Sequence, residues 1–275
     1  MFKYQSFNSY SKINLLDNAI YFNHHDNFND PFECWCIEKD GHPEPVVERE
    51  RFLSVIQTWG FTADRVDEAL EHYKDYVEEL GDWPGIINNR KNSARIACFS
   101  SEADNLLMWS HYADGLRGFC VEFDETAFQE VDSSKSIDIH SVQYRTSPAM
   151  VDSVAYSIAN DMYWHNEDVN DGLSAMFDLD TKVLATKPFQ WAYECEKRAI
   201  IHVDESSREG LLLQYDPRAI KRIIVGEKAE DVNIEYLNNF IKKNNLSLSL
   251  ERASRDSMTF NVNIQTIKDS RNNHA

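Results

Sequence analysis

The stretch YECEKRAII, residues 193–201, combines a strand pattern with two acidic residues at its start. The run Arg198-Ala199-Ile200-Ile201 is typical of a buried or half-buried strand, because it is apolar and β-branched after its arginine. Glu194 and Glu196 are two residues apart, and in a strand this spacing puts both carboxylates on one face. The sequence therefore predicts a strand over residues 193–203 that begins with two like charges side by side.

Further strands are predicted over residues 2–4, 19–23, 94–99, 118–123, 220–225 and 258–267. Between them, Val66, Leu70, Tyr73, Val77 and Leu80 recur at spacings of four and three, which predicts an amphipathic helix. The helical stretches at about 46–89 and 147–185 are interpreted as insertions. Because strands and helices do not alternate regularly, we expect an α+β fold with a mixed or antiparallel sheet, in a single domain over residues 1–275.

The composition is that of a globular protein, with 42% hydrophobic and 12% aromatic residues. No run of about 18 apolar residues occurs, so no membrane span is predicted. The N-terminal MFKYQSFNSY is too polar for a secretory signal. Five cysteines, an odd number, indicate reduced thiols and a cytoplasmic location.

The chain carries a formal net charge of −18. Counterion release requires clustered Lys and Arg, so this charge disfavours general nucleic-acid binding without excluding it. Much of the excess is local, with eight acidic residues between Asp64 and Asp82 against Arg65 and Lys74. We interpret this segment mainly as the solvated face of a helix.

Several familiar catalytic motifs are absent, namely GxGxxG, GxxxxGK[ST], GxSxG, HExxH and the EF-hand loop. His24-His25-Asp26 has no partner at ligand spacing, so we predict a loop there and no metal site. A hydrolytic site on Ser100, Ser101 and His111 would lack a nucleophile elbow. The easy assignments to dehydrogenases, P-loop NTPases, serine hydrolases and zinc peptidases are therefore excluded.

Four segments carry a resemblance to a known family: FNDPFE, ACFSSEADNLLMWSHYADGLRGFCVEFD, KPFQWAYECEKRAI and IKRIIVGEKA. In this order the chain resembles the bacterial domain-of-unknown-function family 2971, from Lys3 to about Ala229. Members of that family often lie near phage-defence genes. The resemblance therefore implies a role in defence, whereas it implies little chemistry.

The layout is also similar to ADP-ribosyltransferases, especially the toxins that modify DNA bases. This resemblance implies an ADP-ribosyltransferase-like sheet core, with Tyr4 at the first motif, Ser100 and Tyr112 near the second, and Glu194-Cys195-Glu196 at the third. The chain departs from the pattern at the first motif, where Lys3 and Tyr4 replace the usual His or Arg. At the second, Phe99-Ser100-Ser101 only approximates the usual Ser-Thr-Ser.

This second resemblance implies an NAD-consuming enzyme, a toxin or a phage-defence effector. Glu196 would stabilise the oxocarbenium charge on the ribose while Glu194 guides the acceptor. Trp109 or Tyr112 would pack on nicotinamide, and Lys3 or Arg95 would meet the pyrophosphate. Glu196 would be a partly exposed carboxylate at the rim of the sheet and would contribute little to stability. We therefore expect Glu196→Gln to lower the free energy of unfolding by about 1 kcal/mol or less.

The alternative is a non-catalytic binding or sensor module in a defence system, which would use the acidic helical insertion to recognise a protein. The two hypotheses differ in one structural expectation. Tyr4, Ser100, Tyr112 and Glu196 should converge on one cleft beside basic groups if the protein uses NAD, and should be dispersed if it is only a binding module.

Overall fold

A large sheet organises the structure, a computed structural model that describes residues 1–80, 85–129, 136–165, 169–203 and 207–267. Among these residues, eight strands form one sheet. In spatial order they are β14 (Val262–Thr266), β13 (Leu250–Arg255), β12 (Ile220–Gly226), β5 (Phe119–Phe123), β1 (Phe2–Gln5), β4 (Ala94–Ser100), β10 (Glu196–His202) and β6 (Asp138–Ser141). Neighbours are antiparallel except β12 and β13, which are parallel. The predicted α+β class with a mixed sheet is confirmed.

Three two-stranded sheets accompany the large one in the described part of the chain. They pair β2 (Ala19–Phe22) with β11 (Leu211–Gln214), β3 (Cys36–Lys39) with β8 (Ala149–Asp152), and β7 (Gln143–Arg145) with β9 (Thr186–Pro188). The strand predicted at residues 19–23 therefore exists but lies outside the large sheet. The sequence analysis missed β3, β6 to β9, β11 and β13. Apart from β13, these strands have only three or four residues, which is too short to show a period.

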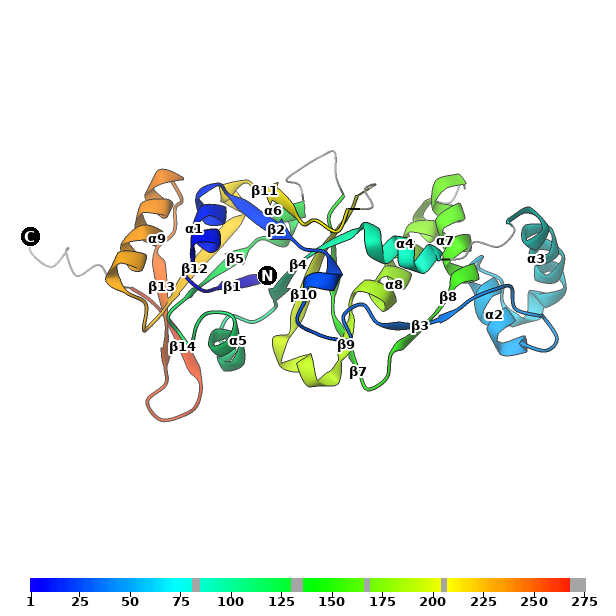
Figure 1. The fold of residues 1–275 in the computed structure, drawn as a ribbon, viewed down its shortest axis with the longest axis horizontal. Coiled ribbons are helices and arrows are strands. Elements are labelled where there is room, and N and C mark those ends of the chain that lie inside the picture. Colours follow the sequence, from blue (N-terminus) through cyan, green and yellow to red (C-terminus); the bar gives the residue numbers. More distant parts are fainter. Residues whose placement is uncertain (81–84, 130–135, 166–168, 204–206, 268–275) are drawn as a thin grey trace, which may run out of the picture.

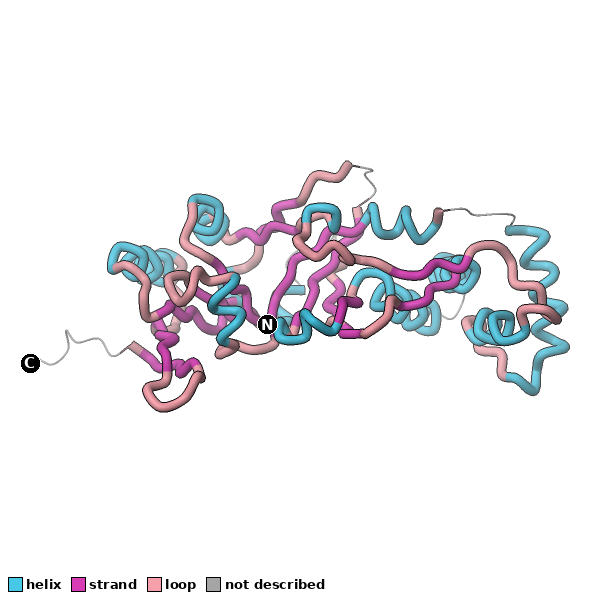
Figure 2. The backbone as a smooth tube through the Cα atoms, turned by 60° about the horizontal axis from the view of Figure 1, so that its bottom comes forward, coloured by secondary structure: helices cyan, strands magenta, loops and turns pink. Residues whose placement is uncertain are grey.

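Helices pack around and beyond the large sheet (Figure 1). They are α1 (Ser9–Leu16), α2 (Arg49–Gln57), α3 (Val66–Leu80), α4 (Ile86–Ser93), α5 (Leu106–His111), α6 (Glu125–Gln129), α7 (Ser153–His165), α8 (Val169–Leu184) and α9 (Asp231–Lys243). The molecule is elongated, with α9 near one end and α2 and α3 at the other. In Figure 2 the strands fill the middle and helices predominate at the α2–α3 end.

The described residues of the stretch at 46–89 contain helices and no strand. Within it, Val66 and Tyr73 are buried together with Phe52, as the predicted stripe requires. The stretch at 147–185 differs from the prediction, because it begins with β8 before α7 and α8. None of the helices described here is long and apolar enough to cross a membrane.

Apolar side chains cover both faces of the large sheet. On β5, Phe119, Val121 and Phe123 face one core, which α9 completes. Cys120 faces a second core on the opposite side of the sheet, together with Trp109. Almost all of β5 is therefore buried, and its Cys120 is buried because α5 covers that face.

Candidate functional site

A cavity of about 210 Å³ lies where β1, β4, α5 and the start of β10 meet. It is lined by Phe2, Lys3, Tyr4, Phe28, Asn29, Cys98, Phe99, Met108, Tyr112, Lys187, Glu194 and Glu196. These residues come from segments far apart in the sequence, brought together because β1, β4 and β10 are neighbours in the large sheet. Residues from all three motifs of the resemblance to ADP-ribosyltransferases thus line one cavity.

Glu194 and Glu196 reach this cavity through a sharp turn. Glu194 ends a 3₁₀ helix over Phe189–Glu194, Cys195 adopts the left-handed conformation with φ 44°, and β10 begins at Glu196. The hydroxyl of Ser100 donates to the carbonyl of Glu194 at 2.8 Å, which fastens the turn to β4. The prediction that both glutamates belong to one strand is therefore wrong, although both side chains still line the cavity.

Lys187 pairs with both of the neighbouring carboxylates and so offsets their mutual repulsion. Its Nζ lies 2.6 Å from Oε2 of Glu194 and 2.9 Å from Oε2 of Glu196. The same ammonium lies 4.9 Å from the centre of the Trp191 ring. A single buried cation thus bridges the pair, because two carboxylates so close together would otherwise repel each other strongly in a medium of low dielectric constant.

Arg198 extends the network away from the cavity. Its Nε lies 3.0 Å from Oε1 of Glu196, and its Nη1 lies 2.5 Å from Oε1 of Glu33. The Arg198 guanidinium also donates to the carbonyl of Leu184. Arg198 is 0% exposed and Glu196 only 4% exposed, so the network is internal. The expectation of a partly exposed rim carboxylate at Glu196 is wrong, since the turn and the two cations enclose it.

The two glutamates have opposite protonation behaviour. Burial alone would raise the pKa of Glu196, but the charges of Arg198 and Lys187 outweigh it and lower the pKa to about 2. Burial raises the pKa of Glu194 above its usual value, and the opposing effects of Lys187 and the Tyr112 hydroxyl do not overcome it. Glu196 is therefore held as an anion, whereas Glu194 takes up a proton at a higher pH than an ordinary glutamate does.

Tyr112 approaches the site from the C-terminal end of α5. Its hydroxyl donates a hydrogen bond to Oε1 of Glu194. Asn105 fixes α5 in place, because its Oδ1 accepts from the backbone N–H groups of Leu107 and Met108 while its Nδ2 donates to the carbonyl of Tyr193 at 2.5 Å. An N-cap residue thus ties the helix to the 3₁₀ turn that carries Glu194.

Two predicted binding residues, Trp109 and Ser100, do not line the cavity. Trp109 is completely buried, with its indole N–H donating to the carbonyl of Ala103 at 2.8 Å and its ring packed against Tyr4. Ser100 is also completely buried and holds the Glu194 backbone from beneath. Both support the site from within the core, because α5 and β4 turn these side chains inward.

Of the two cations predicted to meet the pyrophosphate, Lys3 lines the cavity and Arg95 does not. Lys3 lines the cavity, and its Nζ donates to the carbonyl of Cys98 at 2.7 Å. Arg95 is buried away from it, with its guanidinium donating to backbone carbonyls that include those of Asn92 at 2.9 Å and Glu209 at 2.6 Å. The expectation that Arg95 could meet a ligand phosphate is therefore wrong, since the guanidinium holds backbone carbonyls in this structure.

His24, His25 and Asp26 do lie close together, with one ligand atom of each within 4.8 Å of the others. However, the Asp26 carboxylate lies 2.9 Å from Nη1 of Arg208, and Nδ1 of His24 accepts a hydrogen bond from the Asp26 backbone. Burial lowers the pKa of both histidines, which keeps them neutral. The carboxylate already balances an arginine, so the cluster offers a cation little net negative charge.

The residues that sequence reasoning missed are Lys187 and Glu33. Both stand in segments that carried the family resemblance, Lys187 at the start of KPFQWAYECEKRAI and Glu33 at the end of FNDPFE. Lys187 lies on β9 and meets the glutamates only because the 3₁₀ helix folds back. The available signal was that a charged residue stands inside each of these two segments. The residue with which each one pairs could not be deduced from spacing along the chain.

Comparison with known proteins gives one match. The family model described as protein of unknown function (DUF2971) matches residues 108–199, from Met108 within α5 to Ala199 within β10. The match includes the turn between the two glutamates. No curated protein and no solved structure matches the chain. The matched part of the chain contains Tyr112, Lys187, Glu194 and Glu196, and it supports the resemblance to the DUF2971 family over those residues.

Proposed function

We propose that the protein is an NAD-consuming enzyme of the ADP-ribosyltransferase type, acting in the cytoplasm as a toxin or phage-defence effector. The observation that carries the proposal is the convergence of Tyr4, Tyr112 and both glutamates on one cavity beside Lys3 and Lys187. This is the arrangement expected of an NAD site, except that Ser100 lies beneath the cavity and does not line it. Perturbed carboxylates in a cavity are common at catalytic centres.

The chemistry would begin with the bond between the ribose C1′ and the nicotinamide nitrogen. The bond breaks with its electron pair leaving on nicotinamide, and positive charge develops on the ribose. Glu196 stays ionised because Arg198 and Lys187 hold its pKa at about 2. With Glu194 and Glu33 the network holds three carboxylates against these two cations, so net negative charge remains to stabilise the oxocarbenium character. Bonds to two cations also fix the carboxylate in one orientation, which favours preorganised stabilisation.

Glu194 would then act on the acceptor. An incoming hydroxyl, amine or water attacks C1′ and loses a proton, which the Glu194 carboxylate accepts. Its pKa is raised by burial, and a base whose pKa lies closer to the working pH transfers protons more efficiently. Tyr112 and Lys187 hold the two oxygens of this carboxylate in place.

The size of the cavity restricts which part of NAD would enter. At about 210 Å³ it is smaller than the roughly 300–1,000 Å³ typical of pockets for whole drug-sized ligands. Nicotinamide with its ribose would occupy it, with the rings of Phe2, Tyr4 and Tyr112 as apolar walls. The remainder of the dinucleotide would lie outside this cavity.

The direct test is to incubate the purified protein with NAD and to quantify nicotinamide by chromatography, with and without a cell extract as a source of acceptors. We expect release of nicotinamide above the rate of spontaneous hydrolysis. NAD labelled in the adenine then distinguishes free ADP-ribose from ADP-ribose on a macromolecule. Absence of nicotinamide release in both conditions, together with an unchanged melting temperature in NAD, would contradict the proposal.

Replacing Tyr112 with Phe is expected to lower NAD turnover about 10- to 100-fold and to lower the free energy of unfolding by at most about 3 kcal/mol. The ring remains as a wall of the cavity, while Glu194 loses one hydrogen bond, and a hydrogen bond to a charged group contributes about 1.5–3 kcal/mol. The loss also shifts the pKa of Glu194 further upward, so the pH optimum should move to higher pH. Tyr193→Phe, on the neighbouring turn, serves as the control; an unchanged pH profile in Tyr112→Phe would refute the role of its hydroxyl.

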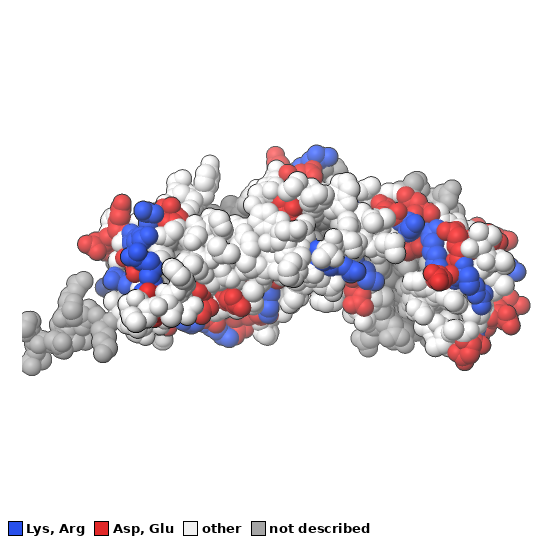
Figure 3. Space-filling view, turned by 90° about the horizontal axis from the view of Figure 1, so that it is seen from below, with Lys and Arg blue, Asp and Glu red and all other residues white. Residues whose placement is uncertain are grey.

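A second candidate is a non-catalytic binding module that uses the acidic helical insertion. Its support is that the acidic residues of α3, such as Glu71 and Asp75, are exposed. In Figure 3, however, acidic and basic side chains are intermingled at the helical end, so no surface of a single sign appears from this side. The NAD assay decides between the two candidates.

A further inference from the structure

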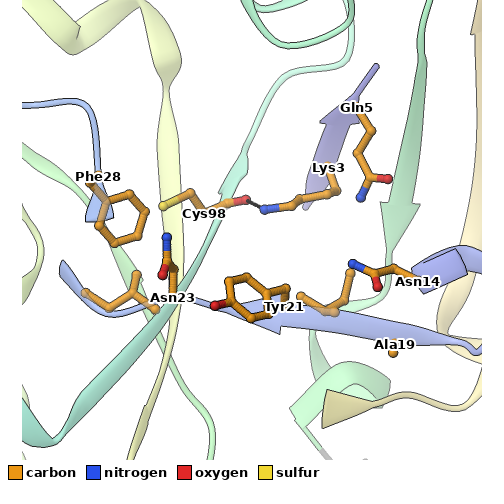
Figure 4. A pocket seen from close by; sticks show the side chains of 10 residues that line it. Lys3, Gln5, Asn14, Ala19, Tyr21, Asn23, Phe28 and Cys98 are labelled. Carbon is orange, nitrogen blue, oxygen red and sulfur yellow. Dashed lines mark hydrogen bonds between the residues drawn. The ribbon is translucent and has the colours of Figure 1, made fainter. Parts of the chain in front are cut away.

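A second cavity, of about 230 Å³, adjoins the first and shares Lys3, Phe28 and Cys98 with it. It lies between β1, β2 and β4, and Figure 4 shows its polar side chains turned toward the same space. Those side chains are Lys3, Gln5, Asn14, Tyr21 and Asn23. The cavity is therefore polar, and its walls offer hydrogen-bond donors from three amides, a phenol and an ammonium.

The charge of this cavity is opposite to that of the whole chain. Among the described residues that line it, none is Asp or Glu, although the chain has a net charge of −18. Within the described residues, the amide nitrogens of Gln5, Asn14 and Asn23 donate no hydrogen bond to the protein; the Asn23 side chain takes part only through its oxygen. Donors without protein acceptors around a single cation are suited to an anion.

Lys3 lacks a counter-ion in the described part of the chain. Its Nζ donates to the carbonyl of Cys98 at 2.7 Å and lies 5.2 Å from the centre of the Phe99 ring, both electrically neutral partners. Burial lowers the pKa of this amine, which the more distant negative charge of Glu196 does not offset. Glu196 itself already pairs with Lys187 and Arg198. An anion in the cavity would supply the missing charge.

We propose that this second cavity binds a phosphate group of a small-molecule ligand, with Lys3 as the cation and the amides and Tyr21 hydroxyl as neutral donors. Because the two cavities share Lys3, a ligand with a sugar in the first cavity would place its phosphate in the second. The identity of that ligand as NAD rests on the proposed function, whereas the phosphate site itself does not.

The test measures binding by isothermal titration calorimetry, with inorganic pyrophosphate, ADP and the neutral adenosine as probes. We expect pyrophosphate and ADP to bind and adenosine to bind at least about 10-fold more weakly than ADP. Lys3→Met should weaken pyrophosphate binding about 10- to 100-fold, the value of a charge-assisted hydrogen bond. Lys74→Met, on the exposed side of α3, is the matched control and should bind as the wild type does.

The pH dependence gives an independent readout. A bound anion raises the pKa of Lys3, so pyrophosphate affinity should fall as the pH rises through the lowered pKa of the free amine, and Lys3→Met should lose this dependence. Asn14→Leu keeps the charge and removes one donor; it should weaken binding by less than Lys3→Met does. It also tests the site if Lys3→Met does not fold.

The outcomes separate the phosphate site from the proposed enzyme. Pyrophosphate binding that depends on Lys3, without any NAD cleavage, would support the site and reject the proposed function. NAD cleavage with wild-type pyrophosphate affinity in both Lys3→Met and Asn14→Leu would overturn the site alone. Equal affinities for ADP and adenosine would also overturn it.

Discussion

Arg198→Met is expected to destabilise the protein by about 3–5 kcal/mol, because it removes one partner from a buried ion pair. The guanidinium is 0% exposed and holds both Glu196 and Glu33. Without it, Glu33 loses its cation, and Glu196 keeps only Lys187. The free energy of unfolding from urea titration measures the loss.

Arg222→Met provides the matched control. Arg222 also stands on a strand and also pairs with two glutamates, Glu122 at 3.4 Å and Glu251 at 2.5 Å, but its side chain is 35% exposed. Ion pairs that water reaches contribute about 1 kcal/mol or less. If both substitutions cost the same free energy of unfolding, burial is not what makes the Arg198 network stabilising, and the prediction fails.

The pH dependence of the Arg198→Met effect follows from Glu196. Its folded pKa of about 2 lies below the ordinary value of 4.5, so its stabilising contribution is present above about pH 4.5 and is lost as the pH falls toward 2. The difference in stability between wild type and Arg198→Met should therefore be greatest at neutral pH and shrink in acid. A difference that stays constant from pH 7 to pH 3 would show that the substitution acts through packing alone.

Glu196→Gln is expected to lower NAD turnover about 100- to 1000-fold, the usual cost of losing one preorganised electrostatic contact. NAD binding should change less than turnover, because the contact strengthens mainly as the glycosidic bond breaks. The measurements are nicotinamide release and NAD affinity of the two proteins. If wild type cleaves NAD and Glu196→Gln cleaves it equally fast, Glu196 is not the catalytic carboxylate.

The stability of Glu196→Gln must be measured in parallel, since the carboxylate is buried. Arg198 keeps Glu33 and Lys187 keeps Glu194, so we expect a loss of about 1–3 kcal/mol, the cost of an imperfectly satisfied buried group. This exceeds the value expected for an exposed carboxylate. Glu125→Gln, which breaks the more exposed pair with Lys197, is the control for stability and should retain turnover.

Glu194→Gln separates the roles of the two carboxylates. It should impair transfer to an acceptor more than hydrolysis of NAD, because Glu194 is assigned to the incoming nucleophile. Glu196→Gln should impair both reactions equally, since both require the same bond to break. If the two substitutions show the reverse pattern, the assignments of Glu194 and Glu196 must be exchanged.

The sequence by itself determined the longer helices and most strands of the large sheet. Repeated apolar residues such as Val66 and Tyr73 predict α3, and runs such as Ala199-Ile200-Ile201 predict β10, because periodicity over many residues reports which face is buried. The resemblance to ADP-ribosyltransferases also selected Tyr4, Tyr112 and the two glutamates, which do line one cavity.

Only the tertiary structure decided which cations pair with Glu194 and Glu196 and which side chains of α5 face the core. Lys187 reaches Glu194 and Glu196 through a 3₁₀ turn and a left-handed Cys195, and Glu33 reaches Arg198 from far along the chain. The side chain of Trp109 turns into the core, where α5 covers β5. Spacing along a chain specifies periodic faces, whereas a partner across a turn or a sheet is fixed by packing, which no local pattern records.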